Sequence, residues 1–150
     1  MENDRVEQAV ALFTGGMACS QAILVTYGPL FGFDRDEAIR IARGFGGGMG
    51  RLSETCGAVT GAFMAISLKF DGTDKQTKED NYALMQEFAR RFKAKHHSLN
   101  CTQLLDCDLG KPEDQAKFRE LGRMQSHCIC YVREAAQHLE ELLELENKPA

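Results

Sequence analysis

Six cysteines are the residues of this chain best suited to do chemistry. They are Cys19, Cys56, Cys101, Cys107, Cys128 and Cys130. Thiolates bind zinc and iron–sulphur clusters, and a pair of thiols can exchange reversibly with a disulfide. The intervals between the cysteines match no compact zinc motif, and no C-x-x-C redox motif is present. Their spacing therefore indicates metal or thiol chemistry without deciding between the two.

The helical pattern around the cysteines is more informative than their spacing. Cys19, Cys56 and Cys128 each fall on the apolar stripe of a different predicted helix, near its N-terminal end. Cys101 falls in an irregular segment, from which a loop could bring it to the same place. Cys130 follows Cys128 by two residues, which is about 200° round a helix, so these two do not face one site. We therefore predict that four of the thiols converge in one pocket.

A glycine-rich segment, 44–70, is predicted to organise this pocket. Five glycines fall within its first seven residues, and apolar residues then recur every three or four positions from Cys56 to Phe70. This period predicts a central helix with Cys56 in its first turn, where free N–H groups and the helix dipole lower the pKa of a thiol. Glycines at such places allow the main chain to approach a bound group closely. Four are predicted to contact a cofactor: Gly46, Gly47, Gly48 and Gly57.

Helical periodicity dominates the remainder of the chain, and no segment alternates as a strand would. Residues 96–112 show no clear regular element, and a segment of that kind is often functional. Arg51, at the end of the glycine loop, is expected at the surface, where it could add positive charge beside the site. The predicted fold is one all-α domain over 1–150, a bundle of about five or six helices around the central glycine-led helix.

Composition narrows the class of function. The 150 residues carry 18 basic and 22 acidic side chains, a net charge of −4, whereas nucleic-acid-binding proteins usually present a basic face to phosphates. The first residues lack the apolar core of a secretory signal, and no run approaches the roughly 20 apolar residues of a membrane span. A cytoplasmic location is therefore expected, where cysteines serve as ligands or redox-active thiols more often than as a disulfide framework.

The sequence around four of the cysteines resembles a known family. The order is a first cysteine in CSQAIL, then CGAVTG from Cys56, then Cys101 ahead of two leucines, then Cys128. This framework is similar to the C_GCAxxG_C_C family of putative redox-active proteins, which are helical domains of about this size. The resemblance implies a redox role, with these four cysteines as the working set and an iron–sulphur cluster as the cofactor. One departure is that Thr55, and not glycine, precedes the core cysteine.

Three functions remain open at this point. The first is electron transfer or redox sensing through an iron–sulphur cluster held by the four cysteines, with a redox protein as partner. The second is thiol–disulfide exchange, in which Cys56 attacks as a thiolate and Cys19 or Cys101 resolves the mixed disulfide. Cys107 and Cys130 lie outside the family pattern, and Cys107 is the candidate spare or resolving thiol. The third is a non-catalytic helical module with inert core cysteines. A homodimeric state is left open, and no nucleic-acid or membrane partner is expected.

Overall fold

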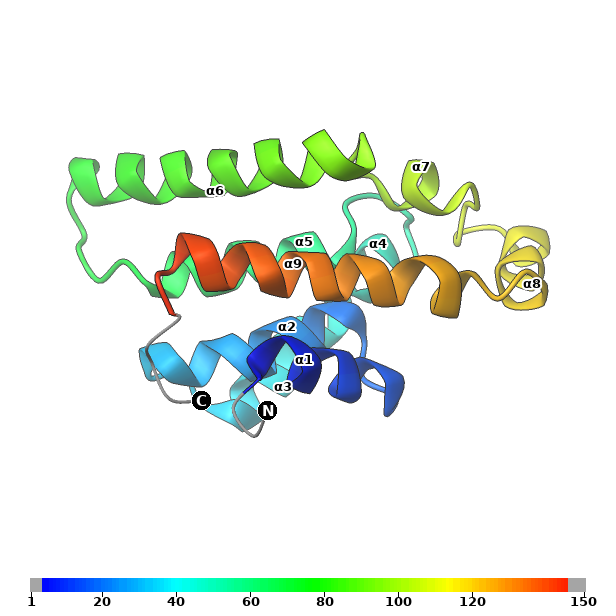
Figure 1. The fold of residues 1–150 in the computed structure, drawn as a ribbon, viewed down its shortest axis with the longest axis horizontal. Helices are drawn as coiled ribbons and strands as arrows, with labels where there is room; N and C mark the ends of the chain where they lie inside the picture. Colours follow the sequence, from blue (N-terminus) through cyan, green and yellow to red (C-terminus); the bar gives the residue numbers. More distant parts are fainter. Residues whose placement is uncertain (1–3, 146–150) are drawn as a thin grey trace.

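The computed structural model describes residues 4–145, and every regular element within them is a helix (Figure 1). The longer helices are α1 (Arg5–Thr14), α2 (Cys19–Tyr27), α3 (Arg35–Ala42), α5 (Gly57–Leu68), α6 (Lys75–His96), α8 (Pro112–Glu120) and α9 (Ile129–Leu142). The shorter ones are η1 (Gly28–Phe31), η2 (Arg43–Phe45), α4 (Gly46–Met49), α7 (Cys101–Leu105) and a π-helical turn, η3 (Met124–Cys128). The prediction of an all-α, single-domain fold is confirmed.

The two segments predicted to be irregular each contain a short helix. The glycine loop forms α4, which is a single left-handed turn and not an ordinary α-helix, with φ values of 64° at Gly47, 70° at Gly48 and 69° at Met49. The segment 96–112 forms α7, which begins where the Asn100 side chain accepts a hydrogen bond from the Gln103 N–H at 3.0 Å. Neither helix is long enough to give a clear hydrophobic period, so periodicity could not detect them.

Helix α5, the predicted central helix, lies inside the bundle, whereas α1 packs on α2 and α9 and α3 packs on α2. Helix α5 packs most extensively against α2 and also contacts α6 and α9. The buried face of α5 is its small-residue face: Gly57, Ala58, Val59, Gly61, Ala62, Ala65 and Ile66. A Cβ atom on Gly61 would lie 2.9 Å from the Ser20 carbonyl oxygen and 3.0 Å from Ile23 Cβ. Glycine at this position therefore allows α2 and α5 to pack closely.

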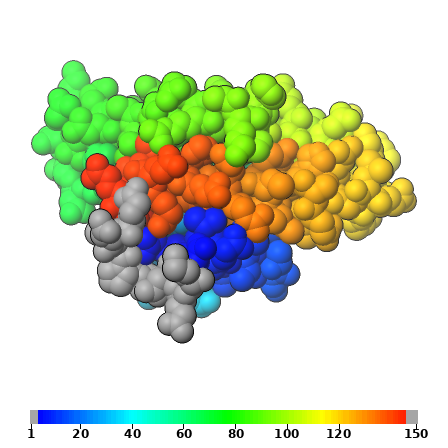
Figure 2. Space-filling view, in the orientation of Figure 1, coloured from blue at the N-terminus to red at the C-terminus, as the bar shows by residue number. Residues whose placement is uncertain are grey.

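The long helix α6 and the final helix α9 cover one side of the molecule. In Figure 1, α9 lies between α6 and α1, and it contacts both. Figure 2 shows the same order on the surface, with α9 as a band between the other two. Phe88 and Phe92 of α6 are fully buried in the interface, with ring centroids 6.1 Å apart. No helix within residues 4–145 combines the length and the apolar composition that crossing a membrane requires.

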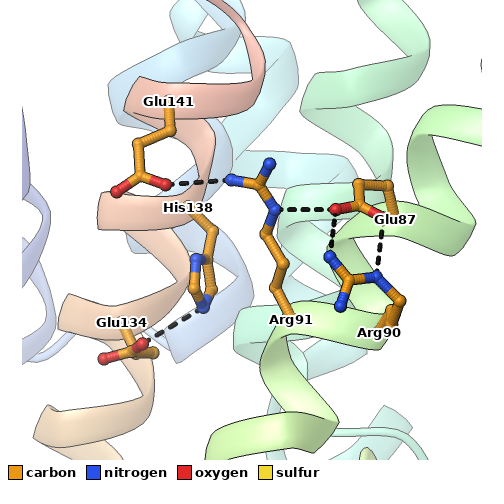
Figure 3. A network of polar contacts seen from close by, with 6 residues as sticks. All are labelled: Glu87, Arg90, Arg91, Glu134, His138 and Glu141. Carbon is orange, nitrogen blue, oxygen red and sulfur yellow. Dashed lines mark hydrogen bonds and ion pairs between the residues drawn. The ribbon is translucent and has the colours of Figure 1, made fainter.

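A chain of ion pairs joins α6 to α9 at the surface (Figure 3). The side chain of Arg91, a residue of α6, contacts Glu87 of the same helix and Glu141 of α9, each at 2.9 Å. Nearby on α9, His138 lies 3.1 Å from Glu134. Because Arg91, Glu87 and Glu141 remain partly exposed to solvent, each of their ion pairs contributes about 1 kcal/mol or less. The pairs favour one alignment of the two helices, while the buried phenylalanines supply most of the stabilisation.

Candidate functional site

A cavity of about 560 Å³ lies beside the N-terminal ends of α2 and α5. Four of the six cysteines line it: Cys19, Cys56, Cys101 and Cys128. These are the four whose positions predicted a common pocket. Cys107 is buried outside the cavity lining, and Cys130 is exposed. The opposite environments of Cys128 and Cys130 agree with their angular separation on a helix.

Each of the four cysteines comes from a different element. Cys19 is the first residue of α2, Cys56 is the N-cap of α5, and Cys101 is the first residue of α7. Cys128 ends the π-helical turn that leads into α9. Three of the four therefore stand at or beside the start of a helix, where free main-chain N–H groups are available to a sulphur atom.

An isolated antiparallel bridge between Thr55 and Asn100 brings two of these cysteines together. The Cys56 N–H donates to the Leu99 carbonyl at 2.8 Å, and the Cys101 N–H donates to the Glu54 carbonyl at 2.5 Å. This short pairing joins the end of the glycine loop to the start of α7. It has no alternating pattern in the sequence, so sequence reasoning missed it.

The four glycines predicted to contact a cofactor all line the cavity, and three of them also lie against cysteine-bearing segments. A Cβ atom on Gly57 would overlap the Cys19 sulphur and lie 2.9 Å from the Phe45 carbonyl oxygen. A Cβ atom on Gly48 would lie 2.8 Å from Cys101 Cβ, and one on Gly46 would lie 2.7 Å from Ala18 Cβ. The glycines therefore let the cysteine-bearing segments approach one another, whatever the cavity binds.

Cys19 and Cys56 form a hydrogen-bonded pair. The Cys56 thiol donates to the Cys19 sulphur, and this bond, helped by main-chain N–H groups of Ser20 and Gly47, lowers the pKa of Cys19 to about 7. The same hydrogen bond, together with burial, raises the pKa of Cys56 well above its ordinary value. In this pair the negative charge therefore resides on Cys19.

This direction differs from the expectation that Cys56 is the thiolate. The expected helix-start effect is present, because a hydrogen bond with the Ala58 main chain lowers the pKa of Cys56. It is outweighed by the hydrogen bond that Cys56 donates and by the cost of charging a buried sulphur. Cys19 is also at a helix start, but it accepts the thiol hydrogen bond in addition to main-chain ones.

The remaining two cavity cysteines favour the neutral thiol. Burial raises the pKa of Cys101 to about 11, although a hydrogen bond with Ser53 opposes the shift. Burial also raises the pKa of Cys128. At neutral pH the cavity therefore contains a single readily formed thiolate among three protonated thiols.

The donor set can be compared with what metals require. Four thiolates are the usual ligands of iron–sulphur clusters, so the residue types fit such a group. Within the described part of the chain, no three His, Cys, Asp or Glu side chains converge closely enough to hold a metal ion. The thiols surround a cavity, unlike the tight tetrahedral shell of a zinc ion. If an iron–sulphur cluster binds here, its ligands would be the four cysteines of the cavity lining, Cys19, Cys56, Cys101 and Cys128.

Ser53 is a buried residue that sequence reasoning missed. Its hydroxyl oxygen accepts a hydrogen bond from the Leu109 N–H at 3.1 Å and contacts the Thr102 hydroxyl at 2.8 Å. The same hydroxyl donates to the Cys107 carbonyl at 3.4 Å. It thereby joins the glycine loop to the segment that carries Cys101. A lone serine next to glycines carries no sequence signal for this role.

Ser53→Ala should lower the free energy of unfolding by about 2 kcal/mol, because the buried Leu109 N–H loses its acceptor. Urea denaturation followed by circular dichroism would measure the change. Ser126→Ala removes an exposed hydroxyl whose side-chain hydrogen bond is to the neighbouring His127, and it should change stability by less than about 0.5 kcal/mol. Equal effects of the two substitutions would contradict the role given to Ser53.

Comparison with known proteins places the chain in a family. No match was found among curated proteins or among solved structures. A family model described as "Putative redox-active protein (C_GCAxxG_C_C)" matches residues 17–142, a span that includes all six cysteines. The match covers most of the chain and agrees with the resemblance seen around its cysteines. The chain therefore belongs to the C_GCAxxG_C_C family of putative redox-active proteins.

Proposed function

We propose that this protein performs reversible thiol–disulfide chemistry, with Cys19 as the attacking thiolate and Cys56 as the resolving thiol. The observation that carries the proposal is the pairing of these two thiols in one cavity, where an interaction with the Cys56 thiol lowers the pKa of Cys19 and the same interaction raises that of Cys56. A nucleophile whose pKa is close to ambient pH attacks disulfides most effectively. The roles of the two cysteines are thus exchanged relative to the sequence-based hypothesis.

The reaction proceeds in two exchange steps. The Cys19 thiolate attacks one sulphur of a substrate disulfide, whose S–S bond breaks as the other sulphur leaves as a thiolate and takes up a proton. Cys56 then loses its proton and attacks the Cys19 sulphur, releasing the second substrate thiol and forming a Cys19–Cys56 disulfide. Two electrons pass from the protein dithiol to the substrate, and the reverse sequence oxidises a dithiol substrate.

Electron transfer or redox sensing through an iron–sulphur cluster is a second candidate. One specific observation favours it: thiol exchange uses two cysteines, whereas four line the cavity. Cys19, Cys56, Cys101 and Cys128 would hold the cluster, which would supply electron exchange with a partner protein. Cys101 and Cys128 would have to lose their protons, against the effect of burial on their pKa values.

Metal analysis and thiol counting on anaerobically purified protein separate the candidates. Thiol exchange predicts no stoichiometric iron or sulphide, and a fall from six free thiols to four after mild oxidation. Peptide mapping should then find Cys19 linked to Cys56. Stoichiometric iron and sulphide with broad visible absorption would instead favour the cluster. Six free thiols after oxidation, without metal, would contradict both candidates and favour inert core cysteines.

A further inference from the structure

The charged side chains that line the cavity are all of one sign. Among the described residues, Arg43 and Arg51 line it and no aspartate or glutamate does, although the whole chain has a net charge of −4. Both arginines are exposed, and neither guanidinium has an ion pair or hydrogen bond with residues 4–145. Two arginines and no acidic residue in one lining give the cavity a positive charge that suits a negatively charged ligand.

The other polar side chains of the lining, apart from the thiols, are already used within the protein. The Gln21 amide donates to the Ile39 carbonyl at 2.9 Å and accepts from the Ala18 N–H at 2.9 Å. The Tyr131 hydroxyl donates to the Leu104 carbonyl at 2.7 Å. The two guanidinium groups are thus the charged donors that remain for a ligand.

Arg51 lies against the same glycine that contacts the reactive sulphur. A Cβ atom on Gly47 would lie 3.0 Å from Arg51 Cγ, and a main-chain hydrogen bond from Gly47 stabilises the Cys19 thiolate. Arg51 has a left-handed φ of 63°, which is unfavourable for a residue with a side chain. The main causes that lower the pKa of Cys19 are hydrogen bonds, and neither arginine is among them. The thiolate therefore does not account for these two cations.

The rest of the lining is suited to an organic molecule. Apolar side chains form much of the wall, among them Phe13, Met17, Leu105, Phe118 and Met124. The volume of about 560 Å³ falls within the range of about 300 to 1,000 Å³ that is usual for small-molecule sites. In such a site the apolar side chains contact the hydrocarbon part of a ligand, and the charged side chains bind and orient its charged group.

We infer that the cavity binds a low-molecular-weight organic disulfide that carries carboxylate groups, with Arg43 and Arg51 binding the carboxylates and Cys19 facing the sulphur atoms. The disulfide part of this inference rests on the proposed function, whereas recognition of the anion does not. Each turnover converts the substrate disulfide into two anionic thiols and the Cys19–Cys56 dithiol into a disulfide, so two electrons leave the protein.

Three small disulfides of similar length test the preference for charge. They are dithiodipropionate, which is anionic, bis(hydroxyethyl) disulfide, which is neutral, and cystamine, which is cationic. Each single-turnover rate with the reduced protein is divided by the rate of the same probe with a small free thiol in the same buffer. Dithiodipropionate should have the highest normalised rate, about 10-fold or more above cystamine, because a hydrogen bond to a charged group typically supplies at least that factor.

One variant combines Arg43→Gln and Arg51→Gln in the same protein. The control variant is Arg35→Gln. Arg35 is exposed, has no ion pair within residues 4–145 and does not line the cavity. The double variant should lose the charge preference, while the control should keep it. An equal preference in wild type and double variant, or no preference in wild type, would overturn the inference while leaving thiol exchange intact.

Binding of an unreactive anion distinguishes failure of the inference from failure of the proposed function. The probe is suberate, in which methylene groups replace both sulphurs of dithiodipropionate, and titration calorimetry measures its affinity. Binding weakened about 10-fold or more in the double variant, and unchanged in Arg35→Gln, supports the anion site even if no disulfide reacts. Disulfides that fail to react would then refute the thiol step alone. Absence of suberate binding by wild type would refute the anion site.

Discussion

Cys19→Ser should abolish rapid alkylation in the cavity at pH 7. With pKa values of about 7 and about 11, the thiolate fractions of Cys19 and Cys101 differ by roughly 5,000-fold at this pH. The greater intrinsic nucleophilicity of the less acidic thiolate recovers roughly 60-fold of this difference, so Cys19 should react about 100-fold faster than Cys101. Timed iodoacetamide labelling with peptide mapping measures each site separately.

The pH dependence of labelling tests the cause of this reactivity. A thiol reacts as its thiolate, so the rate at Cys19 should rise with pH to a half-maximal value near pH 7. Cys56→Ala removes the hydrogen bond that stabilises the charged form, so the pKa of Cys19 should rise and the midpoint should move to higher pH. Cys130→Ser, which alters an exposed thiol, should leave the midpoint unchanged. Fast labelling of Cys56, or an unmoved midpoint in Cys56→Ala, would contradict the direction of the pair.

Gly48→Ala should destabilise the fold by about 3 kcal/mol or more. A left-handed φ costs a residue with a side chain about 1 to 2 kcal/mol, and overpacking typically adds about 1 to 3 kcal/mol. At Gly48, φ is 70° and a Cβ atom would lie 2.6 Å from the Glu54 nitrogen and 2.8 Å from Cys101 Cβ. Urea denaturation measures the loss.

Gly32→Ala is the matched control for this substitution. Gly32 has a similar φ of 81°, but nothing lies within 4 Å of the position that an added Cβ atom would take, so only the backbone cost of about 1 to 2 kcal/mol applies. The difference between the two variants measures the close contact of Gly48 with Ser53, Glu54 and Cys101. Equal losses would show that this contact contributes little to the site.

Helical periodicity predicted the all-α fold and the convergence of three of the cysteines, whereas Cys101 lies in a segment without such a pattern. Helical periodicity shows which residues face inward, and Cys19, Cys56 and Cys128 all lie on inward stripes near helix starts. Cys130 was separated from Cys128 by the same angular argument, and it is exposed. Such arguments depend only on local geometry, which a period of about 3.6 residues encodes.

What could not be predicted depends on contacts between distant segments. The bridge between Thr55 and Asn100 joins residues far apart in the chain and has no local pattern. The direction of the thiol pair depends on which sulphur donates the shared hydrogen bond, and a helix-start argument considers one cysteine at a time. Likewise, only the positions of the surrounding acidic side chains show that Arg43 has no ion pair within residues 4–145.

The glycine-mediated packing of α2 on α5 has a practical consequence. Cys19 and Cys56 begin these two helices, and Gly57 and Gly61 permit the close approach that brings the sulphurs together. Any loosening of this helix pair lengthens the distance between the sulphurs before either helix melts. The pKa of Cys19 therefore depends on the packing of α2 against α5. The labelling rate at Cys19 at neutral pH can report a partial separation of these helices that circular dichroism, which measures helix content, does not detect.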